Sequence, residues 1–179
     1  MNDLNRLKEE VLDSVGQFFR RVDAIAECNT GKVLDAMREA RVSAAHFSPT
    51  TGYAYGDIGR EKLDELFASI FRAERALVRT QFVSGTHALA TVLFGLLRPG
   101  DELISLTGAP YDTMQTVIGH EKPTRGSLKE FGIDYKELPL LDGRVDLDGI
   151  EKILSPRTKV VMIQRSRGYS MREALSIAE

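Results

Sequence analysis

From residue 76 onward, strand-like runs alternate with helical segments, and this rhythm constrains the fold more than any other feature of the chain. Strand-forming residues dominate four runs, and apolar residues at helical spacing fill the segments between them. The alternation predicts an α/β fold with crossover helices, a largely parallel sheet and ligands at the carboxyl ends of its strands. The expected strands are 77–83, 102–106, 134–140 and 159–164, and the expected helices are 86–97, 111–119 and 147–154.

The residues before this region are predicted to be mainly helical. Apolar residues recur every three or four positions over 3–27, and a second short helix is expected after Thr30 and Gly31. Leu63 begins the apolar face of a third helix. Residues 170–179 are expected to open a further crossover helix, which favours a fragment of a longer chain over the alternative of a helical C-terminus.

Composition narrows the functional classes. The 179 residues include 42% hydrophobic residues, enough for a core, and the formal net charge of −2 provides no basic face for nucleic acid. No signal peptide and no long apolar run is present, so we expect a cytoplasmic protein that binds small molecules rather than nucleic acid or membrane. The single Cys28 has no CxxC partner, which favours a reducing compartment and disfavours a zinc site.

A small polar turn, Ser84-Gly85-Thr86-His87, passes directly into an apolar helix. Free amides at the helix start and the positive end of the helix dipole favour a phosphate there, and Gly85 lets the backbone come close to it. The alternative is an ordinary helix capped by Ser84 or Thr86, and this stretch alone leaves both readings open. The apolar residues of 88–97 occupy nearly every helical face, which predicts a helix inside a larger core.

The sequence lacks the motifs that mark several classes of enzyme. GxSxG, the Walker lysine loop and HExxH are absent, and the three histidines lack metal-ligand spacing, so we expect no metal site. The glycines at 52, 56 and 59 do not form the dinucleotide fingerprint after a strand. A nicotinamide-dependent oxidoreductase is therefore a disfavoured alternative.

Three other polar segments accompany the Ser84 turn, namely 53–60, 111–113 and 165–169. Three of the four follow expected strands and should converge on one edge of the sheet. Taken singly, Tyr111 fits a half-buried aromatic at a helix start, and Arg165 and Arg167 fit solvated surface charges. Together the segments supply a phosphate cradle, an aromatic plate and cations for a carboxylate. A phosphorylated aromatic cofactor beside an amino-acid substrate needs these groups.

The chain carries five motifs in order, 52–61, 81–88, 98–102, 126–133 and 163–169. This series resembles the methionine gamma-lyase-like, or aluminium-resistance, proteins, which are related to the cystathionine beta- and gamma-lyases. The resemblance implies an enzyme that uses pyridoxal 5′-phosphate (PLP). It also implies an incomplete fold-type-I PLP-transferase large domain over 51–179, preceded by an N-terminal helical arm over 1–50. The motifs cover nearly the whole chain from about residue 25.

The resemblance also implies roles for single residues. Ser84, Gly85 and Thr86 would hold the cofactor phosphate, Tyr111 would stack on the pyridine ring, and His87 would line the pocket.

Two further groups follow from the same resemblance. Tyr53 and Tyr55 resemble a loop that reaches the cofactor phosphate of the neighbouring subunit. The related lyases carry an arginine where this chain has Tyr55, and Arg60 is the candidate replacement. Arg165 and Arg167 lie where a substrate carboxylate would bind.

The lysine that forms the Schiff base, and the aspartate that pairs with the pyridine nitrogen, are expected beyond Glu179. Lys129 lies before the third strand in a position that fits a surface lysine. The implied activity is elimination of a thiol from a sulfur-containing amino acid by a homo-oligomer, a dimer or tetramer. Residues 1–179 alone are expected to be inactive. The alternative is a catalytically silent chain that only binds ligands or associates with other subunits.

Overall fold

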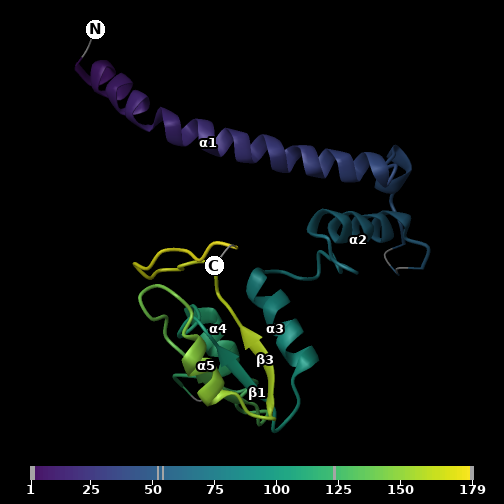
Figure 1. The fold of residues 1–179 in the computed structure, drawn as a ribbon. Coiled ribbons are helices and arrows are strands. Elements are labelled where there is room, and N and C mark those ends of the chain that lie inside the picture. The colour runs from purple at the N-terminus through teal and green to yellow at the C-terminus, as the bar shows by residue number, and fades with distance from the viewer. Residues whose placement is uncertain (1–2, 52, 54, 123, 178–179) are drawn as a thin grey trace. The chain divides into compact units, whose positions relative to one another are not determined.

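The chain forms two compact units, Met1–Thr80 and Gln81–Glu179, in a computed structural model that describes residues 3–51, 53, 55–122 and 124–177 (Figure 1). The first unit is helical and the second is α/β. The finer division into an arm over 1–50 and a large domain from residue 51 stays a prediction.

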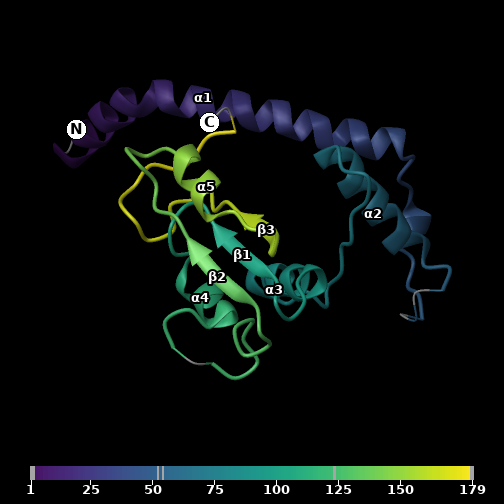
Figure 2. The ribbon, with the colours of Figure 1, turned by 60° about the horizontal axis from the view of Figure 1, so that its bottom comes forward.

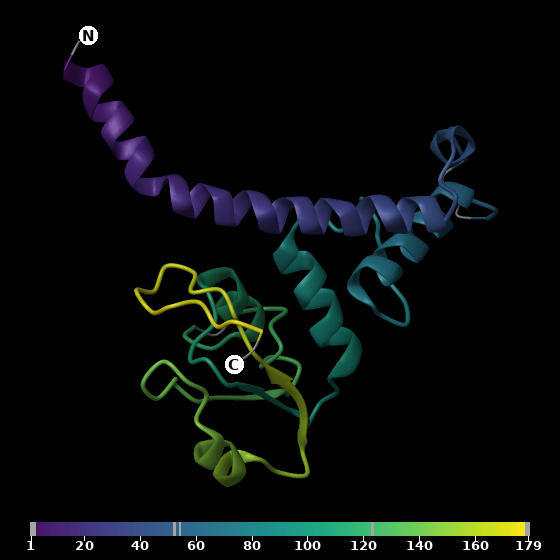
Figure 3. The ribbon, with the colours of Figure 1, turned by 45° about the horizontal axis from the view of Figure 1, so that its top comes forward.

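A single long helix, α1 (Asp3–Glu39), dominates the first unit (Figure 3). The expected break before Gly31 is wrong, because the helix runs through Thr30 and Gly31 without interruption. One glycine in a helix interior costs about 1 kcal/mol relative to alanine, which is not enough to end a helix already nucleated. A short 3₁₀ helix, η1 (Ala44–Phe47), and helix α2 (Ile58–Phe71) complete the unit.

Residues 77–83, expected as the first strand, form no strand. A strand needs a backbone partner, and the described residues provide none along this extended segment. Asp64 of α2 holds the segment instead. Its Oδ1 accepts a hydrogen bond from Val78 N at 2.8 Å, and its two carboxylate oxygens bind the Arg79 guanidinium at 2.7 and 2.9 Å.

The second unit contains a parallel three-stranded sheet in the order β2-β1-β3 (Figure 2). The sequence correctly predicted these strands, although each ends earlier than expected. The helices α3, α4 and α5 also match their expected segments. The bounds are β1 (Glu102–Ser105), β2 (Asp134–Glu137), β3 (Thr158–Met162), α3 (Gly85–Leu96), α4 (Asp112–Ile118) and α5 (Leu147–Ile153).

Helices α3 and α4 pack on one face of the sheet, and α5 lies on the other (Figure 2). The buried cluster joins Leu93 of α3, Leu103 of β1 and Met114 of α4. Only one side of α3 is covered within this unit: Val92 is 55% exposed and Leu96 is 60% exposed. The expectation of a helix enclosed on all faces is therefore not met by this chain.

The expected helix over 170–179 is wrong for its described residues, 170–177, which form bends and extended chain. Leu175 and Arg165 share one main-chain hydrogen bond, in which Leu175 N donates to Arg165 O at 3.0 Å. The Arg172 guanidinium donates to the carbonyls of Gln164, Ser166 and Glu173 at 2.7, 2.7 and 2.8 Å. These contacts fold the segment back along the exit of β3 in place of a helix.

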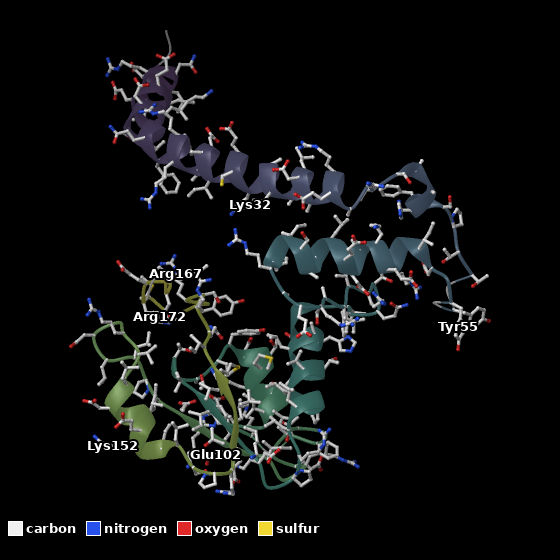
Figure 4. All side chains as sticks on the ribbon, turned by 45° about the vertical axis from the view of Figure 1, so that its right-hand side comes forward. Lys32, Tyr55, Glu102, Lys152, Arg167 and Arg172 are labelled. Carbon is white, nitrogen blue, oxygen red and sulfur yellow. The ribbon has the colours of Figure 1, made fainter. Side chains whose placement is uncertain are left out.

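A fully buried carboxylate, Glu102, joins the three strands at their amino ends. Lys136 of β2 pairs with it at 2.6 Å, and the hydroxyls of Thr158 and Ser155 donate to it at 2.6 and 3.2 Å. These donors, Lys136 first, lower the pKa of Glu102 below its ordinary value. Figure 4 shows Glu102 at the opposite end of β3 from Arg167 and Arg172.

Among the described residues, no helix has the length and apolar character needed to cross a membrane.

Candidate functional site

Three of the polar segments predicted from the sequence meet at the carboxyl edge of the sheet. The hydroxyls of Thr86, at the start of α3, and Thr113, at the start of α4, lie 2.9 Å apart. Tyr111 N donates to the Gln164 side-chain oxygen just beyond β3, at 3.2 Å. The turns at Ser84 and Tyr111 are therefore neighbours, as expected, even though the segment before Ser84 is not a strand. Gln164, which directly precedes the expected segment 165–169, lies beside Tyr111.

Ser84 caps α3, as one of the two sequence interpretations required. Its backbone is extended, and its hydroxyl accepts from His87 N at 3.1 Å. Its carbonyl accepts from Ala88 N at 3.1 Å. Helix geometry leaves the amides of Gly85 and Thr86 without intrahelical acceptors, and no described residue accepts from either.

Gly85 faces open space. A Cβ placed on it would meet no atom within 4 Å, so an incoming group would have direct access to the first turn of α3. Two unused amides, a glycine and the positive end of a 12-residue helix suit an anion. The capped helix and the anion site are thus compatible here, because the cap uses a different amide.

His87 is exposed, and its ring turns back toward the segment before the helix. Its Nδ1 accepts from Val83 N at 3.4 Å, and the ring packs edge-on against Phe82 with centroids 5.6 Å apart. These contacts give the imidazole a local packing role. Its placement as a pocket-lining residue stays a prediction.

Tyr111 occupies the N-cap position of α4 and is half-buried, packed against the core cluster. A tyrosine lacks the short side-chain oxygen with which serine, threonine, asparagine or aspartate caps a helix. Accordingly, the Tyr111 side chain makes no cap hydrogen bond. The loop before Tyr111 is held by other groups: Ser105 Oγ donates to Gly108 O at 2.7 Å, and Gln115 Nε2 donates to Pro110 O at 2.6 Å.

Gln164 is the principal residue to which the sequence analysis gave no role: it ends an expected strand and belongs to the motif 163–169. Its main-chain N donates to Thr107 Oγ1 at 3.2 Å, and its Nε2 donates to Ser166 O at 3.2 Å. A polar residue closing an apolar strand run is the signal that would have found it.

Arg165 and Arg167 are both exposed, but they differ in their contacts. Arg165 Nε donates to Leu175 O at 3.2 Å, and the residue lines a hollow of about 610 Å³ together with Arg144 and Ile163. The carbonyl of Arg167 accepts from Ser170 N at 3.0 Å and Ser170 Oγ at 2.8 Å. The figures place Arg167 beyond the carboxyl end of β3 (Figure 4).

Tyr53 and Tyr55 belong to the first unit, between η1 and α2, and are 79% and 93% exposed. Their neighbours 52 and 54 lie outside the described residues. Arg60, the candidate replacement for the missing arginine, pairs with the N-cap residue Asp57 of α2 at 3.1 Å. That pair ties Arg60 to the start of its own helix.

The donor set at the carboxyl edge fits a phosphorylated aromatic group: free amides and hydroxyls on one side, and a half-buried tyrosine beside them. Lys129 is exposed, as expected for a surface lysine. Within the described part of the chain, no three histidine, cysteine or acidic side chains gather as a metal site would require.

The second unit is an α/β unit in which the open, capped start of α3 lies next to the half-buried Tyr111 turn. The methionine gamma-lyase family profile matches residues 4–179, and the chain belongs to that family.

Individual relatives agree with the family assignment. YnbB of Bacillus subtilis (strain 168) is 43% identical over 178 residues, covering 98% of this chain and 42% of that protein. The structure of a carbon-sulfur lyase involved in aluminium resistance from Clostridium novyi NT aligns with a TM-score of 0.90 at 48% identity, covering 99% and 43% of the two chains. L-methionine gamma-lyase of Pseudomonas putida is 26% identical over 126 residues, covering 69% and 28%. The chain thus spans less than half the length of these relatives.

Proposed function

We propose that this chain carries the phosphate- and ring-binding part of a PLP-dependent carbon–sulfur lyase, built on a fold-type-I large domain. The observation that carries the proposal is the pair of unused amides at Gly85 and Thr86, joined to the Tyr111 turn through the Thr86–Thr113 hydroxyl contact of 2.9 Å. Membership of the methionine gamma-lyase family and the name of the Clostridium novyi relative support it.

In this proposal each residue of the chain has a binding or orienting role. The amides of Gly85 and Thr86 and the hydroxyls of Ser84 and Thr86 bind the phosphate, and the α3 dipole favours its negative charge. The Tyr111 ring packs against the face of the pyridine ring. When bound, PLP supplies an electron sink for removal of a proton from the substrate α-carbon.

The overall reaction we propose releases a thiol and ammonia from a sulfur-containing amino acid and leaves a 2-oxo acid, with one water consumed. Arg165 and Arg167 are our candidates for the substrate carboxylate, since guanidinium groups bind carboxylates in a two-point geometry. His87 would border the site. We place the lysine that forms the Schiff base beyond Glu179.

The test uses the complete gene product, incubated with L-methionine or L-cystathionine with and without added PLP. We expect thiol and 2-oxo acid to appear together, and borohydride reduction with PLP to label one lysine outside residues 1–179. No product from either substrate, or unique labelling of a lysine within residues 1–179, would contradict the proposal.

The competing proposal is a silent chain that only binds ligands or associates with subunits. It predicts phosphate or PLP binding without product, and it gains weight only if the complete gene product is no longer than this chain.

The exposed thiol of Cys28, with no disulfide partner among the described residues, supports our further proposal of a cytoplasmic location.

We also propose that the complete protein is a homo-oligomer, a dimer or tetramer, and that Tyr53 and Tyr55 contribute to a neighbouring subunit's site. An exposed apolar stripe on α1 supports this: Leu4 is 72% exposed, Leu7 56% and Phe18 65%. A second copy of the chain would cover such a face.

Sedimentation over a concentration series tests the assembly. Phe18→Glu, and deletion of residues 1–27, should shift the oligomer toward monomer. Gln17→Glu adds the same charge outside the stripe and should leave assembly unchanged. An oligomer equally stable in all three variants would show that α1 folds against its own subunit.

A further inference from the structure

Gln164 binds four residues of the second unit through its own polar groups, two in the loop after β1 and two in the segment after β3. Its main-chain N and O bind Thr107 and Arg172, and its side-chain amide binds Tyr111 and Ser166. Every donor and acceptor type of this half-buried residue therefore has a partner within the chain.

The chemistry of its partners fixes the orientation of the Gln164 amide. Tyr111 N can only donate, so it must meet the side-chain oxygen, at 3.2 Å. Ser166 O can only accept, so it must meet Nε2, also at 3.2 Å. A flipped amide would oppose donor to donor and acceptor to acceptor, and the two contacts thus select one rotamer.

The loop after β3 closes around this amide. Gly168 has a φ of +57°, and a Cβ at that position would lie 3.5 Å from Gln164 Nε2. The Arg172 guanidinium contacts the main-chain carbonyls of Gln164 and Ser166 at 2.7 Å each. Gln164 is thus held from one side and reaches Tyr111 on the other.

We propose that Gln164 is a positioning residue that sets the ring of Tyr111 for the cofactor by accepting the Tyr111 amide hydrogen. The inference rests on the proposed function, because it gives Tyr111 the ring-stacking role. Tyr111 lacks a side-chain cap bond of its own, so the hydrogen bond that Tyr111 N donates to Gln164 fixes the start of α4 at this residue. This hydrogen bond fixes the backbone of Tyr111, and the position of the backbone sets the direction in which the ring points.

Three variants of the complete gene product separate this role from general stability. Gln164→Leu removes both side-chain hydrogen bonds, and Gln164→Glu keeps an acceptor for Tyr111 N but loses the donor to Ser166 O. Thr107→Val is the matched control, because it removes the bond to Gln164 N and leaves the bond to Tyr111 N intact.

The first readout is hydrogen exchange at the Tyr111 amide in the protein without PLP. We expect Gln164→Leu to speed this exchange about fivefold, since a net hydrogen bond of about 1 kcal/mol corresponds to a factor of about 5. Gln164→Glu should restore most of the protection, and Thr107→Val should leave the Tyr111 amide unchanged.

The second readout compares the affinities for PLP and for inorganic phosphate. Gln164→Leu should weaken PLP binding about tenfold and leave phosphate binding within about twofold, because the phosphate is held at Gly85 and Thr86 rather than by the ring. If Gln164 only stabilised the fold, Gln164→Leu would weaken the binding of PLP and of phosphate alike, or Thr107→Val would cause the same loss of PLP affinity.

Unchanged exchange at Tyr111 in Gln164→Leu would overturn the inference. If Tyr111→Ala weakens PLP binding and Gln164→Leu does not, the proposed function stands and the inference fails. If the unaltered protein binds no PLP, the proposed function fails and the inference fails with it.

Discussion

The two edges of the parallel sheet use polar groups in opposite ways. At the amino edge, Glu102 is fully buried and Lys136, Thr158 and Ser155 surround its carboxylate. At the carboxyl edge, the amides of Gly85 and Thr86 have no acceptor among the described residues, and the turn is largely exposed. A buried charge that is paired with a lysine and bonded to two hydroxyls holds strands together, whereas unused donors at an open edge are available to a ligand.

The largest expected effect comes from breaking the amino-edge cluster. Lys136→Met should lower the free energy of unfolding by about 2 kcal/mol, because it leaves the buried Glu102 carboxylate without its closest cation. Urea unfolding followed by circular dichroism measures the loss. Lys136→Arg keeps the charge and should cost less, and an unchanged midpoint for Lys136→Met would show that Glu102 is satisfied by the hydroxyls alone.

The open edge should respond differently, through ligand binding rather than stability. Tyr111→Ala should weaken PLP binding about tenfold, in line with an aromatic contact of about 0.5–1.5 kcal/mol. Tyr111→Phe keeps the ring face and should bind nearly as well. Equilibrium dialysis of the complete gene product compares them, and equal losses for both variants would assign the function to the hydroxyl.

Acid should act on the amino edge in a direction fixed by the pKa of Glu102. Its folded-state pKa lies below the ordinary value of 4.5, so the carboxylate adds stability above that pH. The contribution is lost as pH falls through the lower, folded-state pKa. Glu102→Gln should flatten the stability profile below pH 4.5, where the unaltered carboxylate loses its contribution. If stability fell with acid in the same way in both proteins, Glu102 would not be the source of that fall.

The smallest effect distinguishes two helix caps. Ser84→Ala and Asp146→Ala each remove an N-cap bond, the first to His87 N at 3.1 Å and the second to Gly149 N at 2.9 Å. Each should cost about 1 kcal/mol of unfolding free energy. Only Ser84→Ala should also weaken phosphate binding, measured by ³¹P line broadening. Equal effects of the two variants on phosphate would argue against a site at α3.

The sequence predicted the parts of this comparison that depend on local pattern. Apolar periodicity located β1, β2 and β3 and their helices, and the polar turns at Ser84 and Tyr111 were correctly predicted to meet, although only the Tyr111 turn follows a strand. The ring-stacking and phosphate-binding roles themselves stay predictions.

The rest depended on tertiary contacts that no local pattern reports. Residues 77–83 have strand-forming side chains but no strand partner in the part of the chain that the structure describes. Gly31 disfavours a helix, yet the 37-residue helix α1 continues through it. The bond from Tyr111 to Gln164 spans 53 positions. The burial of Glu102 also depends on side chains far along the chain, since a glutamate before an apolar run reads as a surface residue.

The most direct test of the account follows backbone amide resonances of the ¹⁵N-labelled complete gene product during titration with PLP or with unphosphorylated pyridoxal. The account predicts that PLP shifts the amides of Gly85 and Thr86 first and that pyridoxal leaves them in place. The amides of β1 near Glu102 should not respond to either compound. Shifts that spare Gly85 and Thr86, or that are the same for both compounds, would contradict a phosphate site at the start of α3.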